Sequence, residues 1–156
     1  MDLVPFGEFL PRRTAIQTRM LTTRHHPVLP EDEYALMESY CPDANCDCRR
    51  VMLNVVAQRQ NAILASISYG FDRDDEFAGP FLDPLNPQSK YAGVLLALVA
   101  EILTDPHYVA RLEAHYDQVK SMVADLSDPA RAMAARRMEA SSHPPQRARR
   151  QVKRRE

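Results

Sequence analysis

Glycine is scarce in this chain of 156 residues, which has 4 glycines against 12 prolines. Proline fixes the backbone torsion φ and suits turns and the first position of a helix. The composition therefore predicts rigid turns and capped helices rather than flexible loops. The sequence also lacks a glycine-rich phosphate loop, a G-x-S-x-G nucleophile motif and an H-E-x-x-H zinc-protease motif. The signatures of P-loop nucleotide binding, serine hydrolysis and zinc proteolysis are therefore absent.

A targeting signal and a long apolar run are also missing. Residues 1–13 do not form a basic region followed by an apolar one, as a secretory signal would. The most apolar stretch, residues 91–103, is interrupted by Glu101 and is shorter than the roughly 20 residues that span a bilayer. We therefore expect a cytoplasmic protein that makes no contact with a membrane.

The net charge of −1 conceals an asymmetry. Residues 136–156 carry 8 basic and 2 acidic side chains, a formal charge of +6, whereas the other residues carry 12 basic and 19 acidic ones, or −7. An acidic body thus bears a basic tail. The arginines and the lysine of residues 147–155 can neutralise phosphates, which predicts weak, salt-sensitive contact with nucleic acid. A purely solubilising tail is the alternative.

Three neighbouring segments, residues 34–41, 50–58 and 62–71, alternate in the period of a β-strand. Their short connections predict an antiparallel meander with one wetter face. Within each segment, alternate residues are predicted to share one side: Tyr34, Leu36, Glu38 and Tyr40 in the first, Val51, Leu53, Val55 and Ala57 in the second, and Ile63, Ala65, Ile67 and Tyr69 in the third.

Helices are predicted downstream, because three pairs combine an N-capping side chain with proline at the first helical position. These pairs are Asn86-Pro87, Asp105-Pro106 and Asp128-Pro129. Apolar stripes at helical spacing follow the first two pairs. A third helix, rich in alanine and arginine, is predicted over residues 130–140.

These patterns predict an α+β fold, in which a three-stranded antiparallel β-meander packs on two to three C-terminal helices. We expect residues 1–31 to form an N-terminal segment packed on the domain and residues 32–140 to form the α+β domain. Residues 141–156 have almost no apolar content, which predicts a disordered basic tail.

All three cysteines lie between the first two predicted strands, at Cys41, Cys46 and Cys48. The Cys46-Asp47-Cys48 spacing puts two side chains on one side of an extended segment, and Pro42 and Asn45 favour a turn that returns to Cys41. Thiolates bind Zn²⁺ well. The sequence therefore predicts a zinc site at the hairpin tip. An odd number of cysteines without a secretion signal argues against a disulfide framework.

A structural zinc site has four ligands, so one is missing from the three cysteines. We predict His26 as the fourth, with His25 close behind and His107 and His115 as weaker candidates. A bound water is the other possibility, which would leave the site open to catalysis with Glu38 as a base. Buried inert thiols and a redox-active pair with lowered pKa remain alternatives.

Arg49 and Arg50, next to the cysteines, can offset the charge of three thiolates. The acidic run Asp72, Asp74, Asp75 and Glu76 is interpreted as a solvated loop, because it lacks the glycine and terminal glutamate of a calcium loop.

The stretch from Glu33 to Cys41, followed by Cys46-Asp47-Cys48-Arg49-Arg50-Val51, resembles a group of uncharacterised bacterial proteins with a "YC…CDCRRV" signature. The segment Asp83-Pro84-Leu85-Asn86-Pro87-Gln88-Ser89 fits the same resemblance, which covers about residues 25–120. The resemblance implies a bacterial origin but no particular activity. Two hypotheses follow from the residues: a zinc-stabilised module that binds a protein partner, and a metalloenzyme with an open three-cysteine site.

Overall fold

The computed structural model describes residues 3–12, 17–128 and 133. The chain divides into two compact units, residues 1–124 and residues 125–156. The sheet and the candidate site belong to the first unit. The predicted basic tail lies outside the described residues, as does the predicted third helix except for Met133.

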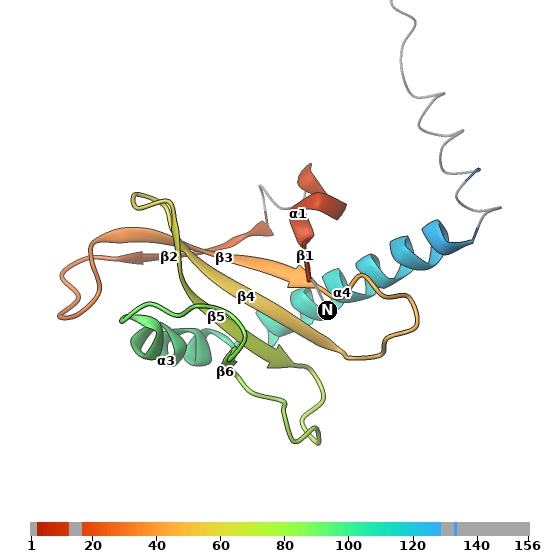
Figure 1. The fold of residues 1–156 in the computed structure, drawn as a ribbon. Coiled ribbons are helices and arrows are strands. Elements are labelled where there is room, and N and C mark those ends of the chain that lie inside the picture. The colour runs from red at the N-terminus through yellow and green to blue at the C-terminus, as the bar shows by residue number, and fades with distance from the viewer. Residues whose placement is uncertain (1–2, 13–16, 129–132, 134–156) are drawn as a thin grey trace, which may run out of the picture. The chain divides into compact units, whose positions relative to one another are not determined.

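The first unit is built on one antiparallel sheet of six strands (Figure 1). Its path runs β1-β3-β4-β5-β6, and β2 pairs with β3 as well. Strands β1 and β2 both pair with β3, β1 near the C-terminal end of β3 and β2 along its N-terminal part. The strands are β1 (Val4–Pro5), β2 (Arg19–Thr23), β3 (Asp32–Tyr40), β4 (Arg50–Ala57), β5 (Ala62–Gly70) and β6 (Phe81–Leu82).

The predicted meander is confirmed as β3, β4 and β5, and the α+β class is confirmed with it. The count of three strands is wrong, because β1 and β2 come from the first 31 residues and β6 follows the acidic loop. The predicted one-sided sets of β3 and β4 are buried. Ile63 is the exception at 54% exposed, since the pairing of β4 with β5 shifts register between Val55 and Val56 and re-aims the side chains beyond the bulge.

The described helices are α1 (Phe6–Phe9), α3 (Ala92–Ile102) and α4 (Pro106–Ser127). The Asp105-Pro106 start is confirmed, since the Asp105 carboxylate accepts the backbone N–H of His107 at 2.9 Å. The Asn86-Pro87 start is wrong, because α3 begins only at Ala92. The segment before α3 is held along β5 instead, where the Gln88 side chain accepts the N–H of Ser66 and donates to its carbonyl.

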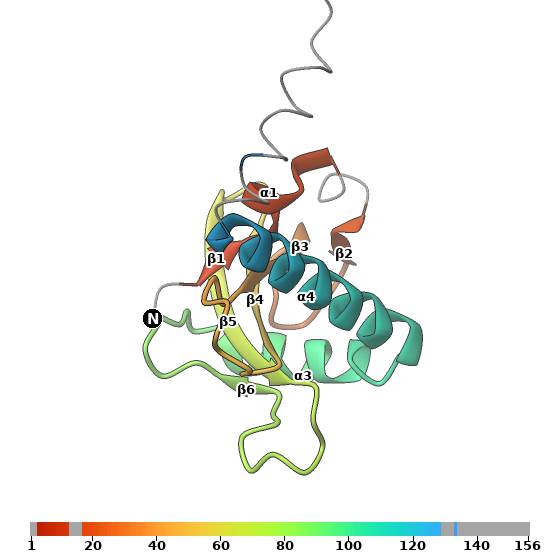
Figure 2. The same cartoon turned by 90° about the vertical axis from the view of Figure 1, so that its right-hand side faces the viewer.

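Helices α3 and α4 cover one face of the sheet (Figure 2). Leu95 of α3 and Leu112 of α4 join Leu36, Leu53 and Ile67 of the strands in one buried cluster. Full burial of each such side chain contributes about 1.5–3 kcal/mol, so this face carries most of the apolar stabilisation. The opposite face is more polar: Ser66 donates to Asn54, and Ser68 accepts from Arg50.

No single helix in the described ranges is long and apolar enough to cross a membrane. Helices α3 and α4 pass that test of length and composition only together, as a pair bent by 97°. Apolar residues of both helices, such as Val99 of α3 and Val119 of α4, are buried in the core of the first unit.

Candidate metal centre

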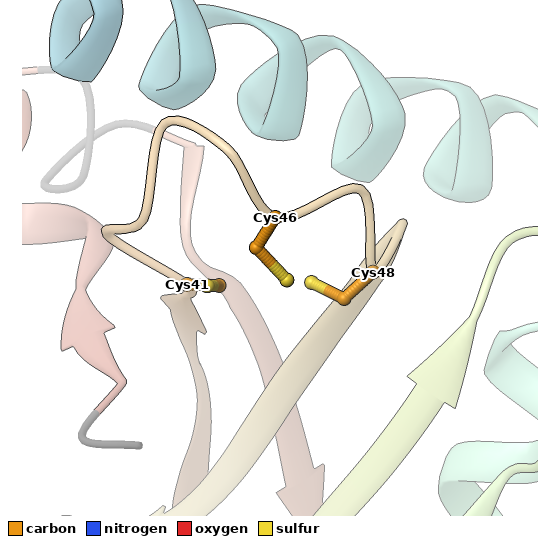
Figure 3. Close-up of side chains that lie close together, drawn as sticks. All are labelled: Cys41, Cys46 and Cys48. Atoms are coloured by element: carbon orange, nitrogen blue, oxygen red, sulfur yellow. The ribbon is translucent and has the colours of Figure 1, made fainter.

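The three cysteines lie in the connection between β3 and β4, residues 41–49 (Figure 3). Asp43 shapes this connection, because its carboxylate accepts the N–H of Asn45 at 2.9 Å and its carbonyl accepts the N–H of Cys46 at 3.2 Å. The chain thereby turns back after Cys41 and brings Cys46 toward it. Arg49 completes the return to β4 with a left-handed φ of 43°.

The ligand atoms of Cys41, Cys46 and Cys48 all lie within 4.8 Å of one another. Figure 3 shows the sulfurs of Cys46 and Cys48 pointing toward each other, with Cys41 beside them. Sulfurs about 2.3 Å from a tetrahedral zinc ion are separated by about 3.8 Å. The three sulfurs are therefore close enough together to hold one metal ion. Cys41 is buried, whereas Cys46 and Cys48 are partly exposed.

The Cys48 thiol is unlike that of a reactive redox pair. Burial, a hydrogen bond that the Cys48 thiol donates to Cys46, and the nearby Cys46 and Cys41 sulfurs together raise the pKa of Cys48 to about 11. A thiol that stays protonated is a poor nucleophile. A bound cation reverses this effect, because it stabilises the thiolate outright.

Helix α4 holds the cysteine connection in place. The Tyr116 hydroxyl accepts the backbone N–H of Arg49 at 3.2 Å, and the Lys120 ammonium donates to the carbonyl of Asp43 at 2.7 Å. Lys120 also lies 5.5 Å from the centroid of the Tyr116 ring, a cation–π contact. The connection is thus fixed at both ends of the turn, which orients the sulfurs before any metal binds.

The two arginines predicted to offset thiolate charge are paired with carboxylates. The Arg49 guanidinium donates to Asp72 at 2.9 Å and lies 3.6 Å from Glu113. The Arg50 guanidinium contacts Asp75 at 3.2 Å and donates to the carbonyl of Phe77. Both arginines therefore tie the acidic loop to the sheet. The acidic run behaves as the loop that the sequence predicted, and it forms no second metal-ligand group within the described ranges.

The structure brings together three of the four predicted metal ligands. His26 lies in the connection between β2 and β3, at the opposite end of β3 from Cys41, and the nine residues of β3 span about 30 Å. Its Nδ1 accepts the backbone N–H of Val28 and Leu29, at 3.1 and 2.9 Å. His26 thus caps its own turn.

The other histidines considered do not join the sulfurs either. His25 is exposed and lies 3.6 Å from Glu31. His107 is exposed in the first turn of α4. His115 is buried in a different cluster. Among the residues that the structure describes, the metal-ligand group consists of the three cysteines alone.

Sequence reasoning missed the cluster around His115 as a unit. Nδ1 of His115 lies 2.6 Å from the Glu38 carboxylate, which also accepts the Tyr40 hydroxyl at 2.8 Å. Nε2 of His115 lies 2.6 Å from the side-chain oxygen of Gln17, and the Phe6 ring stacks on the imidazole at a centroid distance of 4.2 Å. The signal was the glutamate in an otherwise apolar inward row of β3. Glu38 is thus engaged by His115 rather than placed as a base beside the cysteines.

Comparison with known proteins gives no match for this chain: no family model matches it, and neither a curated protein nor a solved structure is similar to it at a significant level.

Proposed function

We propose that this protein is a zinc-stabilised module that binds a protein partner. Zn²⁺ held by Cys41, Cys46 and Cys48 would stabilise the β3–β4 connection. The observation that carries the proposal is the convergence of three sulfurs within 4.8 Å. Soft sulfur ligands in this number suit zinc better than the hard cations calcium and magnesium.

The support for a structural rather than a purely adventitious site comes from the surroundings. Cys41 is buried directly after Tyr40, which is itself fully buried in the core. Tyr40 and Tyr116 pack edge to face, with centroids 6.3 Å apart. A metal at the cysteines therefore adds a cross-link at the point where β3 leaves the core, and its binding free energy becomes folding free energy.

The fourth ligand of the proposed zinc ion is either a protein side chain or a water molecule. The partial exposure of Cys46 and Cys48 favours a second candidate function, a metalloenzyme with an open three-cysteine zinc site, because an open position can hold water or substrate. Cobalt(II) substitution separates the two. Added imidazole changes the visible spectrum of an open cobalt site and leaves that of a closed four-ligand site unchanged.

The test of the proposed function compares Cys46→Ser with Asn45→Ser, an exposed neighbour in the same turn that offers no thiol. We expect Cys46→Ser to release the metal and to unfold at least the β3–β4 hairpin, and Asn45→Ser to keep both. Metal content and thermal melting with and without a chelator are the measurements. If Cys46→Ser melts like the parent with or without metal, the structural role is wrong.

The remaining predictions extend this proposal. The resemblance to bacterial proteins and the cytoplasmic location stay predictions. Nucleic-acid contact through residues 147–155 also stays a prediction, and those residues lie outside the described part of the chain.

A further inference from the structure

Two buried polar atoms near the start of α4 have no hydrogen-bond partner: the Tyr108 hydroxyl and Nε of Arg111. The Tyr108 residue is only 2% exposed. More than nine in ten buried polar groups in proteins find a partner in the protein, an ordered water or an ion. Two unpaired donors on one turn of a helix therefore point to a ligand that both of them meet.

Positive charge gathers at the same place. The guanidinium carbons of Arg19, on β2, and Arg111, on α4, lie 5.6 and 5.3 Å from the centroid of the Tyr108 ring. Throughout the described ranges, no carboxylate forms an ion pair with either arginine, in contrast to Arg49 and Arg50. Two cations thus converge on one tyrosine, and no carboxylate of the described residues lies within ion-pair distance of either.

The one carboxylate that acts on this tyrosine is already committed. Glu38 accepts from His115 and from the Tyr40 hydroxyl. Burial, and to a lesser extent Glu38, raise the pKa of the Tyr108 phenol, so that the hydroxyl keeps its proton and remains a donor at neutral pH. Guanidinium groups are donors only. The free groups at this place are therefore all donors, and an acceptor with negative charge satisfies them best.

We propose that Arg19, Tyr108 and Arg111 form an oxyanion-binding site at the junction of β2 and the first turns of α4, which takes a carboxylate or phosphate group. Planar guanidinium groups match the paired oxygens of both anions. Tyr108 and Arg111 are also close to the N-terminus of a helix of 22 residues, whose backbone dipole favours an anion there. The Arg19–Tyr108 contact joins β2 to the first turns of α4. The site does not depend on the proposed metal centre.

The test titrates the full chain with inorganic phosphate and, separately, with malonate, at constant ionic strength kept with chloride. Backbone amide NMR shifts report binding. We expect saturable shifts at Tyr108 and Arg111, and the tighter of the two anions identifies the source as phosphate or carboxylate. Shifts that chloride alone reproduces would overturn the proposal.

Variants make the assignment specific. Arg111→Gln and Arg19→Gln should each weaken anion binding by about tenfold or more, because each removes a charge-assisted hydrogen bond. Arg24→Gln is the matched control, since Arg24 is exposed in the turn that follows β2. Tyr108→Phe removes only the hydroxyl and tests the site if an arginine variant fails to fold. Unchanged affinity in Arg19→Gln and Tyr108→Phe would contradict the site.

Discussion

At the residue scale, one buried carboxylate, that of Glu38, organises a cluster of polar side chains in the core. Glu38 lies in the core with His115 and Tyr40 as its partners. A buried carboxylate is costly unless it is hydrogen-bonded, and both partners here bond to its Oε2. The cluster joins β3 to α4 and to Gln17 of the N-terminal segment. The cluster therefore holds β3, α4 and the N-terminal segment together through Glu38 and His115.

Glu38→Gln tests that role. The amide keeps the shape of the side chain but removes the negative charge that His115 faces at 2.6 Å. A hydrogen bond to a charged group contributes about 1.5–3 kcal/mol, so we expect a loss of about that size in the free energy of unfolding by urea. Glu33→Gln, an exposed position on the same strand, is the control. A loss below about 1 kcal/mol in Glu38→Gln would mean that the pair contributes little.

The pH dependence of the metal-free protein follows from Cys48. Burial raises its folded-state pKa to about 11 from the ordinary value of 9.0. Folding therefore favours the protonated thiol, and the stability that the thiol contributes is complete below pH 9 and is lost as pH rises toward 11. Metal binding has the opposite slope, because it releases the thiol proton.

The measurement compares urea unfolding of metal-free wild type and Cys48→Ala between pH 8 and pH 11. Other tyrosine and lysine side chains titrate in this range in both proteins, so the difference between the two reports Cys48. We expect wild type to lose stability relative to Cys48→Ala as the pH rises. A relative gain for wild type would reverse the sign and contradict the account.

At the scale of elements, the sequence predicted three of the six strands, β3, β4 and β5, which are long and have a buried face. Alternation identifies β3, β4 and β5, because each has eight or nine residues. The two-residue strands β1 and β6 are too short for any period to register. The five residues of β2 contain Arg19 and two threonines, and their pairing depends on β3 rather than on a pattern of their own.

The candidate sites also differ in how far they could be predicted from the sequence. Cys41, Cys46 and Cys48 are close in sequence, so a turn alone brings them together and their clustering could be predicted. Glu38 and His115 are 77 residues apart, and Arg19 meets Tyr108 only when β2 docks beside α4. Sequence patterns assign such residues to a face but do not say which faces meet. His26 was predicted as a ligand because it comes shortly before β3, but β3 carries the chain away from His26 before it reaches Cys41.

Docking of α4 on the cysteine connection gives a prediction at this scale. Tyr116→Phe removes the acceptor of the Arg49 N–H and keeps the ring that packs against Tyr40 and Phe71. We expect a loss of about 1 kcal/mol in the free energy of unfolding. Tyr69→Phe, a partly buried tyrosine on β5, serves as the control. An equal loss of unfolding free energy in both variants would show that the hydrogen bond between the Tyr116 hydroxyl and the Arg49 N–H does not stabilise the fold.

At the scale of the whole molecule, the sheet, α3 and the candidate site belong to the unit of residues 1–124. Residues 141–156 contain Val152 as their one aliphatic residue larger than alanine. Removal of residues 141–156 should therefore leave the melting temperature within about 2 °C of the parent, because a loss of 1 kcal/mol alone shifts a domain of this size by several degrees. A larger fall on truncation would show that the tail contributes to the folded core.

The central claim is that Cys41, Cys46 and Cys48 hold a zinc ion. Elemental analysis of the purified protein, made without a histidine tag, tests it most directly. The account predicts about one zinc per chain, lost in Cys46→Ser and kept in Asn45→Ser. A metal-free protein whose three thiols all titrate under native conditions would contradict the account.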